Sequence, residues 1–290
     1  MDVELWPGET VGLAGTDVYV RHAVADGAPT MVYVHGLGGS SLNWVPLMHE
    51  MDGELDQWAL DLPGFGESPP AKQSIGAYID VLTSFLERFG EPVHVTANSM
   101  GALAMVTVAA RRPDLVRTLT LISPAMPQVR VPRGAAAMTA LAVPGLGPRL
   151  MGRINSVPPE DQVRRLLRMM YGDPDRLDAD GLKMAVAERE RRMEQAYANS
   201  AFVQALRSLV GRHARFRWWS AWADAASISC PLLVILGGRD VLVGAATGRR
   251  WRRLAPAAQL VMFPTTGHVA MLERPAEVAE LIREHAVEQQ

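Results

Sequence analysis

Apolar and polar residues alternate with two different periods along the first 123 positions of the chain. Residues 18–24 mix apolar and polar side chains in the manner of a half-buried strand, whereas residues 30–35 are apolar almost throughout, as in a strand covered on both faces. Residues 75–89 carry apolar side chains every three or four positions, which predicts a helix. The same criteria predict further strands at 57–61, 92–96 and 116–123, and helices at 42–51 and 102–112.

The pattern changes at Pro124. From there to about Ala225 no segment predicts a strand, and helices are expected at 159–171, 179–194 and 197–210. The alternation then resumes, with strands expected at 232–236 and 259–263 and helices at 245–254 and 275–287. We therefore predict an α/β core of residues 1–123 and 226–290, built on a doubly wound, mostly parallel sheet, with a helical insertion at 124–225.

The composition is that of an ordinary globular protein. The 290 residues are 48% hydrophobic and 21% charged, and the net charge of −2 offers no global field for nucleic acid or a membrane. The insertion is locally basic, with 16 basic and 10 acidic residues, which favours either an anionic substrate or solvated helix faces. A single cysteine, no signal peptide and no long apolar run predict a cytoplasmic protein. The oligomeric state stays open.

The sequence from Ala97 to Gly101 reads Ala-Asn-Ser-Met-Gly and lies between a predicted strand and a predicted helix. A sharp turn of this kind, with Ser99 at its centre, is the layout of a nucleophile elbow. The residues two before and two after the serine must be small there, because strand and helix pass close together. Glycine is usual at both positions, so Ala97 is a departure, and we expect the elbow to tolerate its methyl group.

A serine hydroxyl needs a base to take its proton, and that base needs an orienting partner. Among the seven histidines, His268 follows the last predicted strand, at the edge where doubly wound sheets place their ligands. Asp240 follows the preceding strand and is the candidate acid, although an acid there can also be a helix cap. We predict a catalytic triad of Ser99, Asp240 and His268.

The developing oxyanion of an acyl-transfer reaction needs hydrogen-bond donors. The backbone N–H of Met100 is one candidate, because the residue after the nucleophile heads a helix. The second candidate is the N–H of Leu37, within the glycine-rich run 35–39, where the backbone can approach a substrate closely. His35 is expected to shape this loop by hydrogen bonding rather than to act as the base.

Four motifs appear in order: His-Gly-Leu-Gly-Gly-Ser at 35–40, Asp-Leu-Pro-Gly-Phe-Gly-Glu-Ser at 61–68, Asn-Ser-Met-Gly at 98–101, and Gly-His at 267–268 followed by Glu-Arg-Pro at 273–275. Together with Gly-Gly-Arg-Asp at 237–240, this set resembles the α/β-hydrolase superfamily over the whole chain outside the insertion. The resemblance implies that residues 124–225 form a helical cap over the active site. Serine at position 99 argues against the haloalkane dehalogenases and epoxide hydrolases of this fold, which use an aspartate nucleophile.

These residues favour a serine hydrolase that cleaves an ester, thioester or lactone of a small, largely apolar substrate. Carbon–carbon bond hydrolases, hydroxynitrile lyases and cofactor-free peroxidases share the fold, and a non-catalytic ligand-binding protein is a further alternative. No metal cluster, phosphate loop or dinucleotide fingerprint is present, so no metal or other cofactor is expected. Four tryptophans are candidate pocket residues, with core packing as the alternative account: Trp44, Trp218, Trp219 and Trp222.

Overall fold

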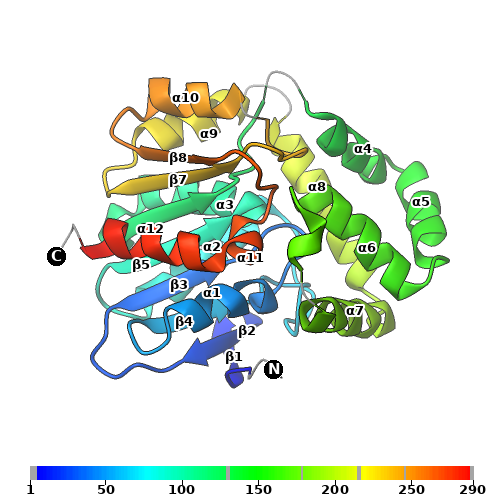
Figure 1. Ribbon diagram of the computed structural model, residues 1–290, viewed down its shortest axis with the longest axis horizontal. Helices are drawn as coiled ribbons and strands as arrows, with labels where there is room; N and C mark the ends of the chain where they lie inside the picture. Colours follow the sequence, from blue (N-terminus) through cyan, green and yellow to red (C-terminus); the bar gives the residue numbers. More distant parts are fainter. Residues whose placement is uncertain (1–4, 129–130, 178, 214–216, 245, 288–290) are drawn as a thin grey trace.

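A single twisted sheet organises the chain (Figure 1). The computed structural model describes residues 5–128, 131–177, 179–213, 217–244 and 246–287. Its eight strands, in spatial order, are β1 (Gly8–Leu13), β2 (Thr16–Ala23), β4 (Asp56–Leu60), β3 (Thr30–Val34), β5 (Val93–Asn98), β6 (Val116–Ile122), β7 (Leu232–Gly237) and β8 (Gln259–Phe263). Only the β1–β2 and β2–β4 pairs are antiparallel. The predicted doubly wound, mostly parallel sheet is thereby confirmed.

Helices cover both faces of the sheet (Figure 1). One layer consists of α1 (Val45–Glu50), α11 (Ala270–Glu273) and α12 (Pro275–Val287), and the other of α2 (Ile75–Glu87), α3 (Ser99–Arg111), α9 (Arg217–Ala226) and α10 (Ala246–Leu254). Strand β3 shows why its sequence is apolar throughout. Met31 and Tyr33 face the core cluster under α1, whereas Val32 and Val34 face the cluster under α2 and α3.

The segment between β6 and β7 holds helices and no strand in the part of the chain that the structure describes. Five of these helices lie together to the right of the sheet in Figure 1, beyond the ends of its strands: α4 (Arg133–Ala142), α5 (Leu146–Asn155), α6 (Pro159–Met170), α7 (Ala179–Glu194) and α8 (Ala198–His213). We call this group the cap. Helix α9 instead packs against α3, within a layer of the core. None of the described helices has the length and apolar character that a membrane span requires.

Several described elements differ from the sequence-based expectation, among them β1, α4 and α5. Strand β1 was not predicted, because it contains Gly8 and Gly12 and its exposed edge position removes the alternating pattern. Helix α4 is rich in alanine and buries only Ala142, so it has no apolar stripe to reveal it. Helix α5 lies among prolines and glycines that indicate a broken segment, yet it extends for 10 residues.

Candidate active site

Ser99 occupies a strained turn between β5 and α3. Its φ angle is +51°, a left-handed conformation that a residue other than glycine adopts only when its surroundings enforce it. At Gly101 an added Cβ would overlap the carbonyl oxygen of His35, so that only glycine fits. Position 97 has no such restriction, because Ala97 is fully buried in the core between β3 and β6 and its methyl group packs there. The local geometry is therefore that of a nucleophile elbow with alanine in place of the first glycine.

His268 and Asp240 form a buried pair beyond the ends of β8 and β7. The Nδ1 atom of His268 lies 2.7 Å from Oδ2 of Asp240, and their side chains are 4% and 1% exposed. The other carboxylate oxygen, Oδ1, accepts the backbone N–H groups of Leu242 and Val243 at 2.7 and 2.9 Å. Burial opposes ionisation, but His268 and these N–H groups together lower the pKa of Asp240 below its ordinary value. An ionised Asp240 holds the proton of His268 on Nδ1, which leaves Nε2 able to accept one.

Asn98 links this pair to the elbow. Its Nδ2 atom donates to the carbonyl oxygen of His268 at 3.2 Å and to that of Ile122 at 3.1 Å. The side chain immediately before Ser99 thus holds the loop that carries His268, 170 positions later in the chain. The sequence analysis missed this role. The one available signal was a polar residue at the end of a buried strand, immediately before the candidate nucleophile.

The loop after β3 lies directly against the elbow. A Cβ added to Gly36 would come within 2.9 Å of the Cβ of Ser99 and 2.8 Å of Oδ1 of Asn98, so the backbone of this loop touches the nucleophile. Leu37 follows in a turn, and Met100 is the second residue of α3, where a helical N–H has no partner within the helix. Both candidate oxyanion donors therefore belong to segments that adjoin Ser99.

His35 is a buried support for this loop. Its Nδ1 atom donates to the carbonyl oxygen of Gly36 at 2.7 Å, and its Nε2 atom accepts the N–H of Leu62 at 2.9 Å. Burial, together with the positive charge of Arg192, lowers the pKa of His35 to about 4 even though the Gly36 bond opposes the shift. The ring is neutral at neutral pH and already uses both nitrogens, as expected for a structural histidine.

The depressed pKa of His35 predicts a loss of stability in acid. In the unfolded chain the pKa returns to about 6.5, so the contribution is complete above that pH and is lost as the pH falls toward about 4. Between these two pH values, the contribution of His35 to the free energy of unfolding changes by an amount on the order of 3 kcal/mol. Between pH 6.5 and 4, urea unfolding of His35→Gln should therefore show a smaller fall in free energy with acidification than the wild type.

The quantity to compare is the difference in unfolding free energy between the wild type and His35→Gln, because Asp61 makes the unfolding free energy change with pH in the opposite direction. Burial raises the pKa of the Asp61 carboxyl to about 6, so its contribution is present at low pH and is lost as the pH rises through that value. Asp61 is retained in both proteins, and its effect cancels on subtraction. Parallel curves of unfolding free energy against pH would contradict the assignment to His35.

The structure places two of the four candidate tryptophans, Trp44 and Trp222, in the core. Trp44 has no exposed surface and stacks on Tyr33 at 5.2 Å between ring centroids, so it lines no space that a water molecule could enter. Trp222 is 2% exposed, packs edge-on against Trp251 and donates its indole N–H to the carbonyl oxygen of Pro127. Both are core residues, which corrects the prediction. The side chains of Trp218 and Trp219 lie outside the described residues.

The cap rests on the loops around Ser99. Arg192 of α7 donates to the carbonyl oxygen of Gly38 in the loop that carries Leu37, and Gln195, just beyond α7, donates to the carbonyl oxygen of Gly66 at 3.2 Å. The ring of Phe202 in α8 packs over Gly38, within 3.1 Å of where a Cβ would stand. Ser99 itself is 9% exposed.

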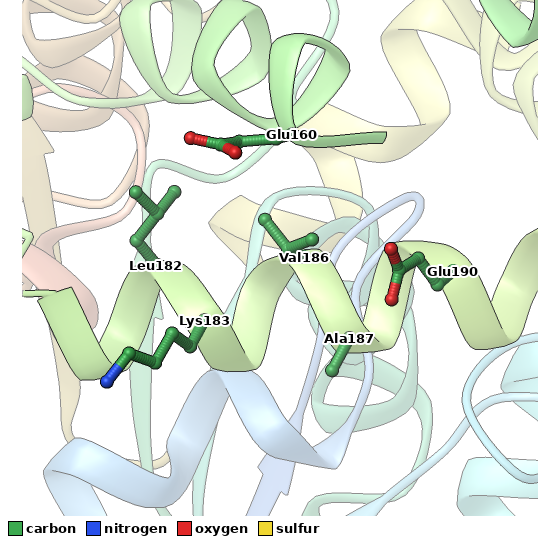
Figure 2. A pocket seen from close by; sticks show the side chains of 6 residues that line it. All are labelled: Glu160, Leu182, Lys183, Val186, Ala187 and Glu190. Carbon is green, nitrogen blue, oxygen red and sulfur yellow. The ribbon is translucent and has the colours of Figure 1, made fainter. Parts of the chain in front are cut away.

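A hollow of about 260 Å³ opens elsewhere, between α6 and α7. Figure 2 shows the six side chains that line it: Glu160, Leu182, Lys183, Val186, Ala187 and Glu190. None of them belongs to the predicted triad or to the oxyanion loop. This hollow is a feature of the cap surface rather than the reaction site. Within the described residues, no group of three or more histidine, cysteine, aspartate or glutamate side chains could hold a metal ion.

Known proteins resemble this chain over most of its length. The model of the alpha/beta hydrolase family matches residues 31–281. A pimeloyl–acyl-carrier protein methyl ester esterase of Neisseria meningitidis serogroup C is 24% identical over 265 residues, which cover 91% of this chain and 96% of the esterase. The dihydrolipoyllysine-residue acetyltransferase component of the acetoin cleaving system of Pseudomonas putida is 24% identical over 87% of this chain, and the chain spans 62% of that protein's length.

A solved structure extends the likeness to three dimensions. The 2-hydroxy-6-oxo-6-phenylhexa-2,4-dienoate hydrolase of Rhodococcus sp. strain RHA1 superposes with a TM-score of 0.79 at 20% sequence identity. The match covers 97% of this chain and 98% of that one. At this identity the likeness concerns the fold, insertion included, and not the substrate.

Proposed function

This chain belongs to the alpha/beta hydrolase family, and from that premise we propose that it is a serine hydrolase acting through an acyl-enzyme at Ser99. The observation that carries the proposal is the convergence of three features. Ser99 is held in a left-handed turn, the His268–Asp240 pair is hydrogen-bonded at 2.7 Å, and Asn98 ties the loop of that pair to the turn.

The proposed reaction follows from these positions. The Nε2 atom of His268 takes the hydroxyl proton as Oγ of Ser99 attacks the substrate carbonyl, and the ionised Asp240 stabilises the resulting imidazolium. The N–H groups of Met100 and Leu37 bind the oxyanion of the tetrahedral intermediate. His268 then gives its proton to the leaving group, and the same residue activates the water that releases the acid.

The proposed substrate is a small, largely apolar ester, thioester or lactone, taken up beneath the cap. Two features of the cap support an apolar acyl site. Phe202 lies over the loop that carries Leu37, and Arg192 is engaged by that loop's own carbonyl group. The similarity to a protein named for its action on a methyl ester is a further support.

The test is covalent labelling. A fluorophosphonate should modify the wild-type protein at one serine, and digestion with peptide mass spectrometry should place the adduct on the peptide that contains Ser99. The reagent needs both an activated serine and an oxyanion site, so a folded but unlabelled protein, or an adduct on another serine, would refute the proposal.

Carbon–carbon bond hydrolysis is the second candidate, because the solved structure that matches over 97% of the chain bears the name of a dienoate hydrolase. A panel of p-nitrophenyl esters, a thioester, a lactone and a vinylogous diketone separates the two. Turnover of the diketone alone would assign the chain to the second class, and turnover of the acyl substrates supports the first.

A further inference from the structure

Glu273 places a buried carboxylate next to the predicted base. It is the last residue of α11 and is 4% exposed. Its Oε1 atom accepts the backbone N–H of Gly267, the residue before His268, at 2.6 Å. The N–H of Gly172 lies 3.0 Å from Oε2 and 3.1 Å from Oε1 and is shared between them, and Oε2 also accepts the N–H of Asp173 at 3.2 Å. Among the described residues, backbone N–H groups are thus the hydrogen-bond partners of this carboxylate.

The two sets of N–H groups belong to different parts of the molecule. Gly267 lies on the His268 loop of the core, whereas Gly172 and Asp173 follow α6 in the cap. A buried charge is costly unless it is hydrogen-bonded, and charge-assisted bonds to N–H groups are stronger than neutral ones. Because one carboxylate serves both sides, it fixes the position of the cap segment relative to the loop that carries the base.

The backbone segments on either side of the Glu273 carboxylate also pack directly against each other. His268 donates its own N–H to the carbonyl oxygen of Met170, at the end of α6, at 2.6 Å. An added Cβ at Gly172 would overlap the backbone of Thr265 and Thr266, and one at Gly267 would overlap Met170. We call this contact between residues 170–173 and 265–268 the base-side seam. The two segments of this seam approach so closely that a small displacement of one must move the other.

We propose that Glu273 is a positioning residue that holds His268 in its reactive orientation and links that orientation to the position of the cap relative to the core. The proposal rests on the proposed function, because it concerns the base of that reaction. Glu273 does not touch the reacting atoms and acts through Gly267 and the base-side seam.

The test uses Glu273→Gln in the full chain. The amide has one acceptor oxygen. If its NH₂ group replaces Oε1 it faces the N–H of Gly267, and if it replaces Oε2 it faces those of Gly172 and Asp173, so at least one bond of the carboxylate is lost. His268 serves both formation and breakdown of the acyl-enzyme, so kcat and the fluorophosphonate labelling rate should fall by about 10- to 100-fold, as for a displacement of about 1 Å in a catalytic group. The KM for a p-nitrophenyl ester should change by less than about threefold, because substrate contacts remain.

Glu280→Gln is the matched control. It removes an exposed acidic charge of α12, outside the base-side seam, and should leave the labelling rate within about twofold. Thermal unfolding of each variant shows that it is folded at the assay temperature. If Glu273→Gln does not fold, Glu273→Asp keeps the buried charge but is one methylene too short to reach both sides, and it should also label more slowly than the wild type.

The outcomes separate the two proposals. If the wild type is not labelled, the proposed function fails. If the wild type is labelled and a folded Glu273 variant is labelled at the same rate with unchanged kcat, the positioning role is refuted and Glu273 only stabilises the fold. A rise in KM with unchanged kcat would also refute it, since Glu273 would then act on the cap and not on His268.

Discussion

Replacing Ser99 with alanine should lower kcat for an ester substrate by roughly 10⁴ to 10⁶-fold and abolish fluorophosphonate labelling. The substitution removes only the hydroxyl group, and the φ angle of +51° is open to alanine at the same cost as to serine. The fold and the oxyanion donors are retained, so the loss isolates the nucleophile. Steady-state hydrolysis and intact-protein mass measure the two effects.

Ser123→Ala is the matched control for this variant. Ser123 lies at the end of the neighbouring strand β6, is 1% exposed and has a φ angle of +45°, so it is a second buried serine in a left-handed turn. Its hydroxyl has no hydrogen-bond partner among the described residues, and its removal should leave kcat within about threefold. Equal losses in both variants would mean that strain or folding, and not nucleophilic attack, explains the effect of Ser99→Ala.

Asp240→Asn should lower kcat/KM by about 10⁴-fold with little change in stability. The N–H groups of Leu242 and Val243 keep the amide oxygen of the new asparagine at the Oδ1 position, so its NH₂ group faces His268. Nδ1 of His268 must then accept a hydrogen bond, which places the ring proton on Nε2. In that tautomer Nε2 cannot take the proton of Ser99, and fluorophosphonate labelling should slow in parallel with ester hydrolysis.

The chain offers a matched control in a second aspartate–histidine pair. Oδ1 of Asp56 lies 2.7 Å from Nε2 of His22, between β4 and β2 at the other side of the sheet. Asp56→Asn makes the same chemical change there and should leave kcat/KM within about threefold. A value for Asp240→Asn within about tenfold of the wild type would contradict the role of Asp240 in setting the tautomer.

Local patterns in the sequence predicted seven of the eight strands and suggested the residues of the proposed triad. Ser99, Asp240 and His268 each follow a strand, and parallel strands deliver such residues to one edge. Composition was less informative in the cap. Alanine-rich α4 buries too few large side chains to show a period, and tryptophans on amphipathic helices fit a core as well as a pocket.

Contacts between distant segments were beyond the reach of those patterns. Nothing near Glu273 indicates that its carboxylate meets Gly172, 101 positions earlier, because the N–H groups that it binds are present at every residue except proline. The same holds for Asn98 and the carbonyl oxygen of His268. Backbone partners carry no side-chain signature, so such roles become visible only when the chain is folded.

The base-side seam limits how this fold can be recombined. A chimera that exchanges only the helices between β6 and β7 would bring in a foreign segment opposite Glu273 and Gly267, where even a methyl group has no room. A graft that also carries residues 265–273 from the same donor would preserve the match. Substrate range in this scaffold should therefore be transferable by a two-piece exchange, with the cap and the loop of the base moved as one unit.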